Sequence, residues 1–189
     1  MVAAATHPVR VPLTYDEYVL FPDDGRRYEL MDGDPYVSPA PSTFHQTVSR
    51  RLQFALMALL EETRLAFVFD APVDVILSPT DVVQPDLALV RSARRSIITQ
   101  RAIEGAPDVV VEILSPFGRD RDERLKYALY ARFGVPEYWI VDPEVGHISV
   151  NVLGEQGYRV HALCDRASRI ESPGFSELTF PLEPLFRPL

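Results

Sequence analysis

Apolar residues recur with the period of an α-helix between residues 41 and 62. The positions that share one helical face are Val48, Leu52, Ala55, Leu56 and Leu59. This spacing predicts a helix whose apolar side packs against another element of the fold. Ser42 or Thr43 can accept a hydrogen bond from the first helical turn, so we expect the helix to begin there.

A second helical pattern covers residues 120–134, with Asp120 as the expected N-cap and Gly134 at the expected end. Its expected apolar face consists of Leu125, Ala128, Leu129 and Phe133. A short third helix is expected within residues 13–21, where Thr14 is followed by a glutamate at the spacing of a capping box.

Elsewhere the pattern changes to short apolar runs between turn residues, which is typical of β-strands. Such runs occupy residues 66–70, 73–78, 82–90, 109–114 and 137–142. Residues 26–38 predict a hairpin that turns at Asp32 and Gly33, and residues 147–164 predict a second hairpin. Segment 91–104 is expected to form a loop and a short helix.

The strands on either side of the second main helix form a βαβ unit with it, so they are expected to run parallel. We therefore predict an α/β fold in which two main helices flank a central mixed sheet, with additional N-terminal and C-terminal hairpins. The chain is expected to form a single domain over residues 1–189. Residues 1–12 are expected to be a flexible arm, and residues 165–189 a proline-rich tail that wraps the surface.

Composition narrows the class of protein. Apolar residues make up 47% of the 189 positions, which is enough for a substantial core. The single cysteine, Cys164, excludes an internal disulfide and a cysteine-rich zinc site. No apolar run approaches the roughly 18 residues of a membrane span, and the N-terminal residues lack a signal-peptide pattern. We therefore expect a cytoplasmic protein without a membrane partner.

The net charge of −8 argues against nucleic-acid binding, because phosphate contacts require local positive charge. A basic patch is nevertheless compatible with this total. The clustered arginines are Arg50, Arg51, Arg91, Arg94, Arg95 and Arg101. Solvated surface is the alternative interpretation of each of them.

Glu112 interrupts the otherwise apolar strand at residues 109–114. An isolated buried carboxylate would take up a proton, so a paired base or a metal ion is expected beside it. Asp86, on a neighbouring predicted strand, is the best second carboxylate, because residues across two strands lie within about 6 Å. Asp108 lies four residues along the same strand, at roughly 13 Å, and is too distant to share one ion.

Lys126 is the only lysine of the chain, and it lies on the helix that follows the strand of Glu112. Tyr130 follows one turn later on the same helical face. An ammonium group near two carboxylates would complete a site that cleaves phosphodiesters, with Mg²⁺ held by Asp86 and Glu112. An exposed helix lysine is the alternative interpretation of Lys126.

Four stretches in this order resemble the Uma-type bacterial family of restriction-endonuclease-like proteins, within the PD-(D/E)xK nuclease superfamily. They are "YELMDGDPYVSPAPSTFHQTVS", "VVQPDLALV", "GAPDVVVEILSP" and "DRDERLKYALYARFGVPEYWIVDP". The resemblance covers roughly residues 14–186, including the closing "PGF" segment. It implies a restriction-endonuclease-like core with Asp86 and Glu112 as the two acids of the motif. Leu114 stands where the superfamily has its lysine, and Lys126 is implied as the replacement.

The resemblance further implies an endonuclease that acts on DNA with Mg²⁺ or Mn²⁺, and cleavage of both strands would suit a homodimer. Glu29 stands where related nucleases place an additional acid, although the solvent side of a hairpin is the alternative. His45 is a candidate contact to a phosphate or a metal-bound water, with a structural histidine as the alternative. Ser38 and Ser115 each precede a proline and have no nearby base, so both are expected in turns.

Two further functions remain open from the sequence. One is a catalytically degenerate nuclease fold that binds nucleic acid or assembles with other proteins, favoured by the overall acidity and by Leu114. The other is a small-molecule enzyme with a carboxylate site, for which only the net charge argues.

Overall fold

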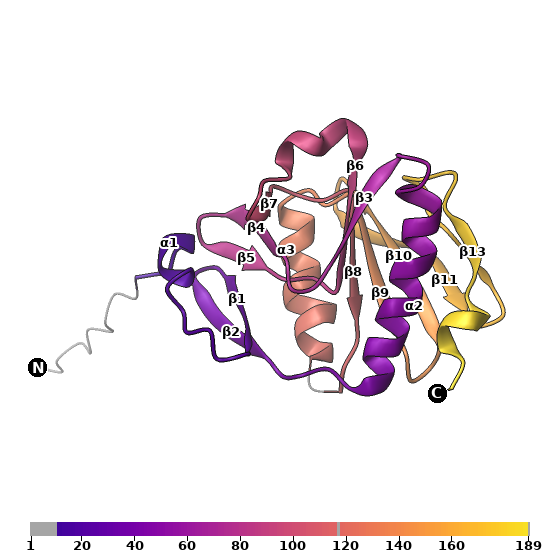
Figure 1. Ribbon diagram of the computed structural model, residues 1–189, viewed down its shortest axis with the longest axis horizontal. Helices are drawn as coiled ribbons and strands as arrows, with labels where there is room; N and C mark the ends of the chain where they lie inside the picture. The colour runs from indigo at the N-terminus through magenta and orange to yellow at the C-terminus, as the bar shows by residue number, and fades with distance from the viewer. Residues whose placement is uncertain (1–10, 117, 189) are drawn as a thin grey trace, which may run out of the picture.

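The computed structural model describes residues 11–116 and 118–188. Its centre is a six-stranded sheet in the order β11-β10-β9-β8-β6-β3 (Figure 1). The strands are β3 (Ala66–Asp70), β6 (Leu87–Arg91), β8 (Val109–Ile113), β9 (Glu137–Asp142), β10 (His147–Gly154) and β11 (Gly157–Asp165). The expected arm at residues 1–12 falls almost entirely outside the described residues.

β8 and β9 run parallel, with Glu112 opposite Ile140, while the other neighbouring pairs of this sheet run antiparallel. The prediction of a βαβ unit in a mixed sheet is therefore confirmed. Every residue of β8 and β9 is buried, because other elements cover both faces of these two strands. The expected C-terminal hairpin, β10 and β11, extends the sheet beyond β9.

α2 (Thr43–Leu60) covers one face of the central sheet, as the apolar period predicts (Figure 1). Ser42 caps it, because its hydroxyl oxygen accepts a hydrogen bond from the amide of His45 at 3.1 Å. The apolar side chains that α2 buries are Val48, Leu52, Leu56 and Leu60. They belong to one core cluster together with alternate residues of β6, β8 and β9.

The second main helix lies on the opposite face and begins with an unusual turn. Its first part, η2 (Arg121–Lys126), is a π-helix that continues into α3 (Tyr127–Arg132). The predicted apolar face is wrong at Leu125, which is 46% exposed, and at Ala128, which is also exposed. Asp120 makes no capping hydrogen bond. The wider π-turn and a buried ion pair bring a different set inward, namely Asp122, Lys126, Leu129 and Tyr130.

A second sheet of five strands packs beside α3 in the order β2-β1-β5-β4-β7. Its strands are β1 (Arg27–Met31), β2 (Asp34–Ser38), β4 (Asp74–Ser78), β5 (Asp81–Val83) and β7 (Ala102–Glu104). β1 and β2 form the predicted hairpin, and its two turn residues, Asp32 and Gly33, have φ angles of +52° and +73°. Positive angles at both positions suit the twist of a tight hairpin.

The predicted single strand at residues 82–90 is wrong, because β5 and β6 belong to different sheets. Pro85 lies between them and has no amide hydrogen to donate to a sheet. The chain therefore leaves one sheet at Val83 and enters the other at Leu87. Segment 91–104 contains the expected short helix, η1 (Ser92–Ile97), but also the unexpected strand β7.

The segment expected to wrap the surface instead contributes side chains to the core. It forms the ribbon β12 (Arg169–Glu171) and β13 (Thr179–Pro181), followed by η3 (Glu183–Phe186). The side chains that it adds to the cluster under α2 are Ile170, Phe175, Leu178, Phe180, Leu182, Leu185 and Phe186. Their apolar spacing is irregular, so no helix or strand period marks them in the sequence.

The short helix expected within residues 13–21 is α1 (Tyr15–Tyr18), and it begins with the predicted capping box between Thr14 and Glu17. No helix within residues 11–116 and 118–188 is both long and apolar enough to cross a bilayer.

Candidate active site

Two adjoining cavities open where the second sheet, the start of α2 and the end of β8 meet. Their volumes are about 420 and 510 Å³. Both are lined by Arg27, His45 and Asp86, together with the segment from residue 38 to residue 41. The smaller cavity is also lined by Arg121 and Asp122 from the π-helical turn. The cavities therefore bring together residues from elements that are far apart in the sequence.

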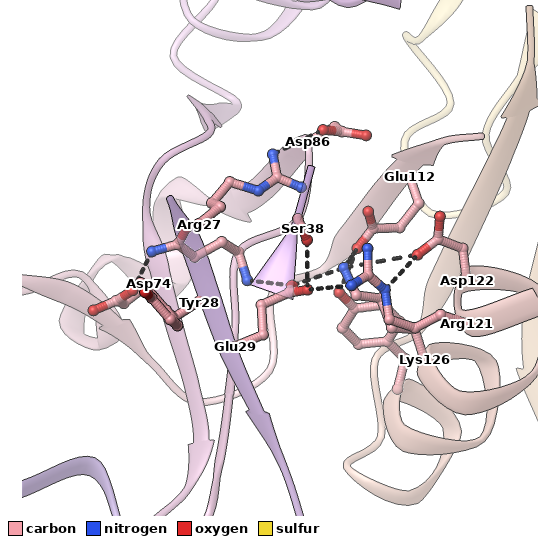
Figure 2. A network of polar contacts seen from close by, with 12 residues as sticks. Arg27, Tyr28, Glu29, Ser38, Asp74, Asp86, Glu112, Arg121, Asp122 and Lys126 are labelled. Atoms are coloured by element: carbon pink, nitrogen blue, oxygen red, sulfur yellow. Dashed lines mark hydrogen bonds and ion pairs between the residues drawn. The ribbon is translucent and has the colours of Figure 1, made fainter. Parts of the chain in front are cut away.

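A buried ion pair lies beneath the smaller cavity. The ammonium nitrogen of Lys126 lies 2.7 Å from Oε1 of Glu29 and 2.8 Å from Oε1 of Glu112 (Figure 2). The hydroxyl of Tyr130 donates a second hydrogen bond to the same oxygen of Glu112, at 2.8 Å. Lys126 and Glu29 are fully buried, and Glu112 is 2% exposed. Strand β1, strand β8 and the second helix are thus joined by one ammonium group.

The two carboxylates on Lys126 have different proton affinities. Burial raises the pKa of Glu112 to about 8, and the charge of Lys126 only partly opposes this effect. Burial also disfavours the charge on Glu29, but Lys126 and Arg121 lower its pKa below the ordinary value. The pKa of Lys126 is raised despite burial, because Glu112 and Glu29 stabilise its charge. Both carboxylates therefore stabilise the charge of Lys126, and Glu29 is the one that ionises more readily.

Asp86 lies at the end of β8, next to Glu112. β6 pairs with β8 as Leu87 opposite Val111, and one further step of this register brings Asp86 opposite Glu112. Oδ2 of Asp86 accepts a hydrogen bond from the amide of Ile113 at 2.8 Å. This contact holds the carboxylate over the strand end, where the larger and smaller cavities meet.

Two cationic or polar side chains complete the environment of Asp86. Arg27 donates a hydrogen bond to Oδ1 at 3.2 Å, and Nε2 of His45 lies 3.2 Å from Oδ2. Burial opposes ionisation, but the contacts of His45 and Arg27 lower the pKa of Asp86 to about 2. Nε2 of His45 also lies 2.9 Å from the carbonyl oxygen of Ile113, to which it can donate. Asp86 is therefore ionised and fixed in orientation.

Asp122 is a further acid of the site. It is 4% exposed, and burial raises its pKa to about 6, although Lys126 and Arg121 oppose the shift. Its Oδ1 atom lies 3.9 Å from the ammonium nitrogen of Lys126 and 3.8 Å from Nε of Arg121. We refer to Glu29, Asp86, Glu112 and Asp122 as the site carboxylates.

The residues suggested by the sequence fall into two connected groups. Glu29, Glu112 and Lys126 are in direct contact, and the exposed alternatives for Glu29 and Lys126 are wrong because both are fully buried. His45 contacts Asp86 instead. Asp108 lies apart, where it accepts a hydrogen bond from the amide of Arg91.

The two serines also lie near the site. The hydroxyl of Ser38 donates to Glu29 at 3.4 Å, and that of Ser115 accepts the amide of Gly118 at 3.1 Å in the expected turn. The expectation of a turn is wrong at Ser38, which is the last residue of strand β2.

Three side chains at the site were missed from the sequence, namely Arg27, Arg121 and Asp122. Arg27 alternates with Glu29 along β1, so the strand period places both on one face. Asp122 precedes Lys126 by four residues, which places both on one helical face. The strand period applied from Glu29 would have identified Arg27, and the helical spacing applied from Lys126 would have identified Asp122. No local pattern indicates Arg121.

The ligand chemistry of the site fits a divalent cation. Carboxylate oxygens are the donors that Mg²⁺ prefers, and the site carboxylates provide them. Three permanently charged side chains lie among these acids, namely Arg27, Arg121 and Lys126. Within the described residues, no three His, Cys, Asp or Glu side chains already converge around a metal position. A cation would therefore have to displace present partners, such as Lys126 from Oε1 of Glu112.

Comparisons with known proteins identify the family and the fold of the chain. The family Uma2, described as "Putative restriction endonuclease", matches residues 15–183. A solved structure described as a "putative nuclease belonging to DUF820", from Anabaena variabilis ATCC 29413, superimposes with a TM-score of 0.76 at 21% identity, covering 93% of this chain and 98% of the other. No protein with a curated description has significant sequence similarity to the chain.

Proposed function

The chain belongs to the Uma2 family and has a restriction-endonuclease-like fold, and on this premise we propose that it is a nuclease that hydrolyses phosphodiester bonds in DNA. The proposal rests on one observation above all. Asp86, which directly precedes β6, lies beside Glu112 at the end of β8, and Glu112 contacts the buried cation Lys126. Phosphodiester hydrolysis requires a similar set, because negative charge develops on the phosphate in the transition state.

We assign Asp86 and Glu112 as the residues that hold Mg²⁺ or Mn²⁺. Asp86 is suited to this role because it is ionised and its orientation is fixed by the amide of Ile113. A bound divalent cation would supply a water molecule of lowered pKa and would polarise the phosphate. Glu112 loses its proton more readily when a cation is near, so the ion and the carboxylate stabilise each other.

We assign Lys126 the role of the superfamily lysine. Leu114 lies on the same face of β8 as Glu112 and is buried against Leu129 and Tyr130. Lys126 reaches this face from the helix, so a lysine at either position would bring its ammonium group to Glu112. There the ammonium group would orient the attacking water or stabilise negative charge on the phosphate oxygens.

Two arginines are suited to bind the phosphodiester itself. Arg27 lines both cavities, and Arg121 lines the smaller one. Each keeps a buried Nε atom without a hydrogen-bond partner in the described structure. Guanidinium groups bind phosphate oxygens through pairs of parallel hydrogen bonds, so these free donors favour an anionic ligand in the cavity.

A second candidate function is a nucleic-acid-binding or assembly module without catalysis. Glu112 and Lys126 are closed off beneath the cavity rather than lining it, and their charged atoms are paired with each other. In a non-catalytic module, this closed ion pair would stabilise the fold and have no other role. The non-catalytic alternative does not require metal binding, whereas the nuclease proposal requires it.

Metal binding and cleavage distinguish the two functions. We expect Mn²⁺ to bind the wild-type protein in calorimetry and to bind Glu112→Gln and Asp86→Asn weakly or not at all. Asp120→Asn is the matched control, because Asp120 is an exposed acid near the start of the same helix. Nicking of circular duplex DNA should require the metal and both acids. Absence of Mn²⁺ binding to the wild-type protein would refute the nuclease proposal and favour the alternative.

A further inference from the structure

We infer that Asp122 is a third carboxylate ligand of the divalent cation, beside Asp86 and Glu112. This inference rests on the function proposed above. Neither the superfamily motif nor the spacing of its acids includes this residue. Asp122 comes from the π-helical turn η2, whereas Glu112 comes from β8 and Asp86 directly precedes β6, the strand paired with β8.

The first argument is that Asp122 is an unsatisfied buried carboxylate. Its side chain is 6% exposed, and Oδ1 has no hydrogen-bond partner among the described residues. The nearest cationic nitrogens, on Arg121 and Lys126, lie 3.8 and 3.9 Å away, which is beyond hydrogen-bonding distance. Buried charged groups without partners are costly and rare, so an oxygen left in this state indicates a missing ligand.

The second argument is that the backbone holds Asp122 in place from both sides. Its amide donates to the carbonyl oxygen of Gly118 at 3.0 Å, and its own carbonyl oxygen accepts the hydroxyl of Tyr138 at 2.9 Å. The second contact comes from β9 and anchors the π-turn to the central sheet. A wide turn of this kind is often found at functional sites, where it directs a side chain that a regular helix would direct elsewhere.

The third argument is the position of Asp122 between the cavity and the buried ion pair. It lines the 420 Å³ cavity together with Asp86 and Arg121, while its i+4 neighbour Lys126 lies below. Figure 2 shows Asp122 beside Glu112, with Lys126 and Arg121 next to it. Burial disfavours the charge of Asp122, and Lys126 and Arg121 oppose this effect only in part. No side chain in this group hydrogen-bonds Oδ1 of Asp122. A divalent cation bound to Oδ1 would stabilise the ionised carboxylate.

The test is metal binding rather than activity. We would titrate Mn²⁺ by calorimetry into the wild-type protein, Asp122→Asn and Glu123→Gln. Glu123 is the matched control, because it is the next residue of the same turn and its side chain is 42% exposed. We expect Asp122→Asn to weaken Mn²⁺ binding about tenfold or more, since even residues that only orient a ligand have effects of this size. Glu123→Gln should bind as the wild-type protein does.

The outcomes separate this inference from the proposed function. If the wild-type protein binds Mn²⁺ and Asp122→Asn binds it equally well, Asp122 is not a ligand and the nuclease proposal stands. If Asp86→Asn abolishes binding and Asp122→Asn weakens it, both stand. If the wild-type protein binds no Mn²⁺, both are overturned.

A second variant tests coordination directly, including the case in which Asp122→Asn does not fold. A thiolate at a ligand position favours a soft metal over a hard one. We expect Asp122→Cys to prefer Cd²⁺ over Mn²⁺ more strongly than the wild-type protein, whose own Cys164 provides the background. Glu123→Cys should show no such change. An unchanged preference in Asp122→Cys would overturn the inference.

Discussion

The ammonium nitrogen of Lys126 lies 2.8 Å from Oε1 of Glu112, although the two residues come from a helix and a buried strand fourteen positions apart. Lys126 is the only lysine of the chain, and its side chain is fully buried. The candidate active site and the packing of the second helix onto the sheet therefore depend on the same contact. Any change at this contact is expected to alter stability as well as activity.

Removal of the ammonium group should destabilise the fold strongly. Lys126→Met leaves Glu29 and Glu112 without their shared cation, and loss of one partner of a buried ion pair costs about 3–5 kcal/mol. Urea unfolding followed by circular dichroism measures this change. Arg124→Met is the control, because Arg124 is 79% exposed, and it should unfold as the wild-type protein does. Equal stability of Lys126→Met and the control would show that the ion pair contributes nothing.

A lysine at the superfamily position should restore part of what Lys126→Met loses. Leu114 is 4% exposed and shares a face of β8 with Glu112, so Leu114→Lys would direct an ammonium group toward the same acids. We expect the double variant, Leu114→Lys with Lys126→Met, to be more stable than Lys126→Met alone. DNA nicking in Mn²⁺ should recover with it. If the double variant is less stable than Lys126→Met, a lysine at residue 114 does not replace the ammonium group of Lys126 beside Glu112.

The ionisation of Asp86 should make stability depend on pH in the acid range. Its pKa of about 2 lies below the ordinary value of 3.8, so folding favours the ionised form. The stabilisation is fully present above about pH 4 and disappears as pH falls toward 2, amounting to about 2 kcal/mol. Unfolding free energies of the wild-type protein and Asp86→Asn should therefore converge between pH 4 and pH 2. A constant difference over that range would contradict the assignment.

His45 should act on the metal site through Asp86. Its Nε2 atom lies 3.2 Å from Oδ2 of Asp86 and 2.9 Å from the carbonyl oxygen of Ile113, so it positions the carboxylate against the end of β8. Because such orienting contacts typically contribute 10–100-fold to metal affinity, His45→Ala should weaken Mn²⁺ binding by about that factor. His161→Ala, on the exposed strand β11, provides the control for loss of a histidine. Unchanged Mn²⁺ affinity in His45→Ala would exclude a positioning role.

A buried acid outside the site should hold the C-terminal segment. Glu137 accepts hydrogen bonds from the hydroxyl of Ser172 at 2.8 Å, from the amide of Gly174, and from the indole of Trp139 at 3.0 Å. Glu137→Ala leaves these donors unpaired, at a cost of about 1–3 kcal/mol for each buried group. Limited proteolysis should then cleave the segment after β12 faster than in the wild-type protein. The control is Glu177→Ala, a change of an exposed acid in the same segment.

Local patterns predicted the elements of the fold better than the partners of the site. The bounds of β3 and β9 agree with the apolar runs, because both runs end at turn residues. The prediction of one strand at residues 82–90 was wrong, because the apolar run continues across Pro85 although the chain changes sheets there. The face of the second helix was mispredicted at Leu125, because a π-turn changes the period on which the prediction depends.

Glu29, Asp86 and Glu112 were found because each interrupts an apolar strand or belongs to a motif, whereas Asp122 was missed. Arg27 and Arg121 were also missed, because an arginine in a hairpin or a helix start has the same local signature whether it is buried or exposed. Their contacts with Asp86 and Glu29 join residues that are 59 and 92 positions apart. Only the tertiary arrangement of the second sheet against the helix determines such pairs.

The late position of the core residues has a consequence for synthesis of the protein in the cell. Leu185 and Phe186 are buried in the same cluster as Leu52 and Leu56 of α2. During synthesis these apolar side chains leave the ribosome after the strands and the helix that they pack against. The core under α2 is therefore completed only once the segment at residues 183–186 can pack onto it.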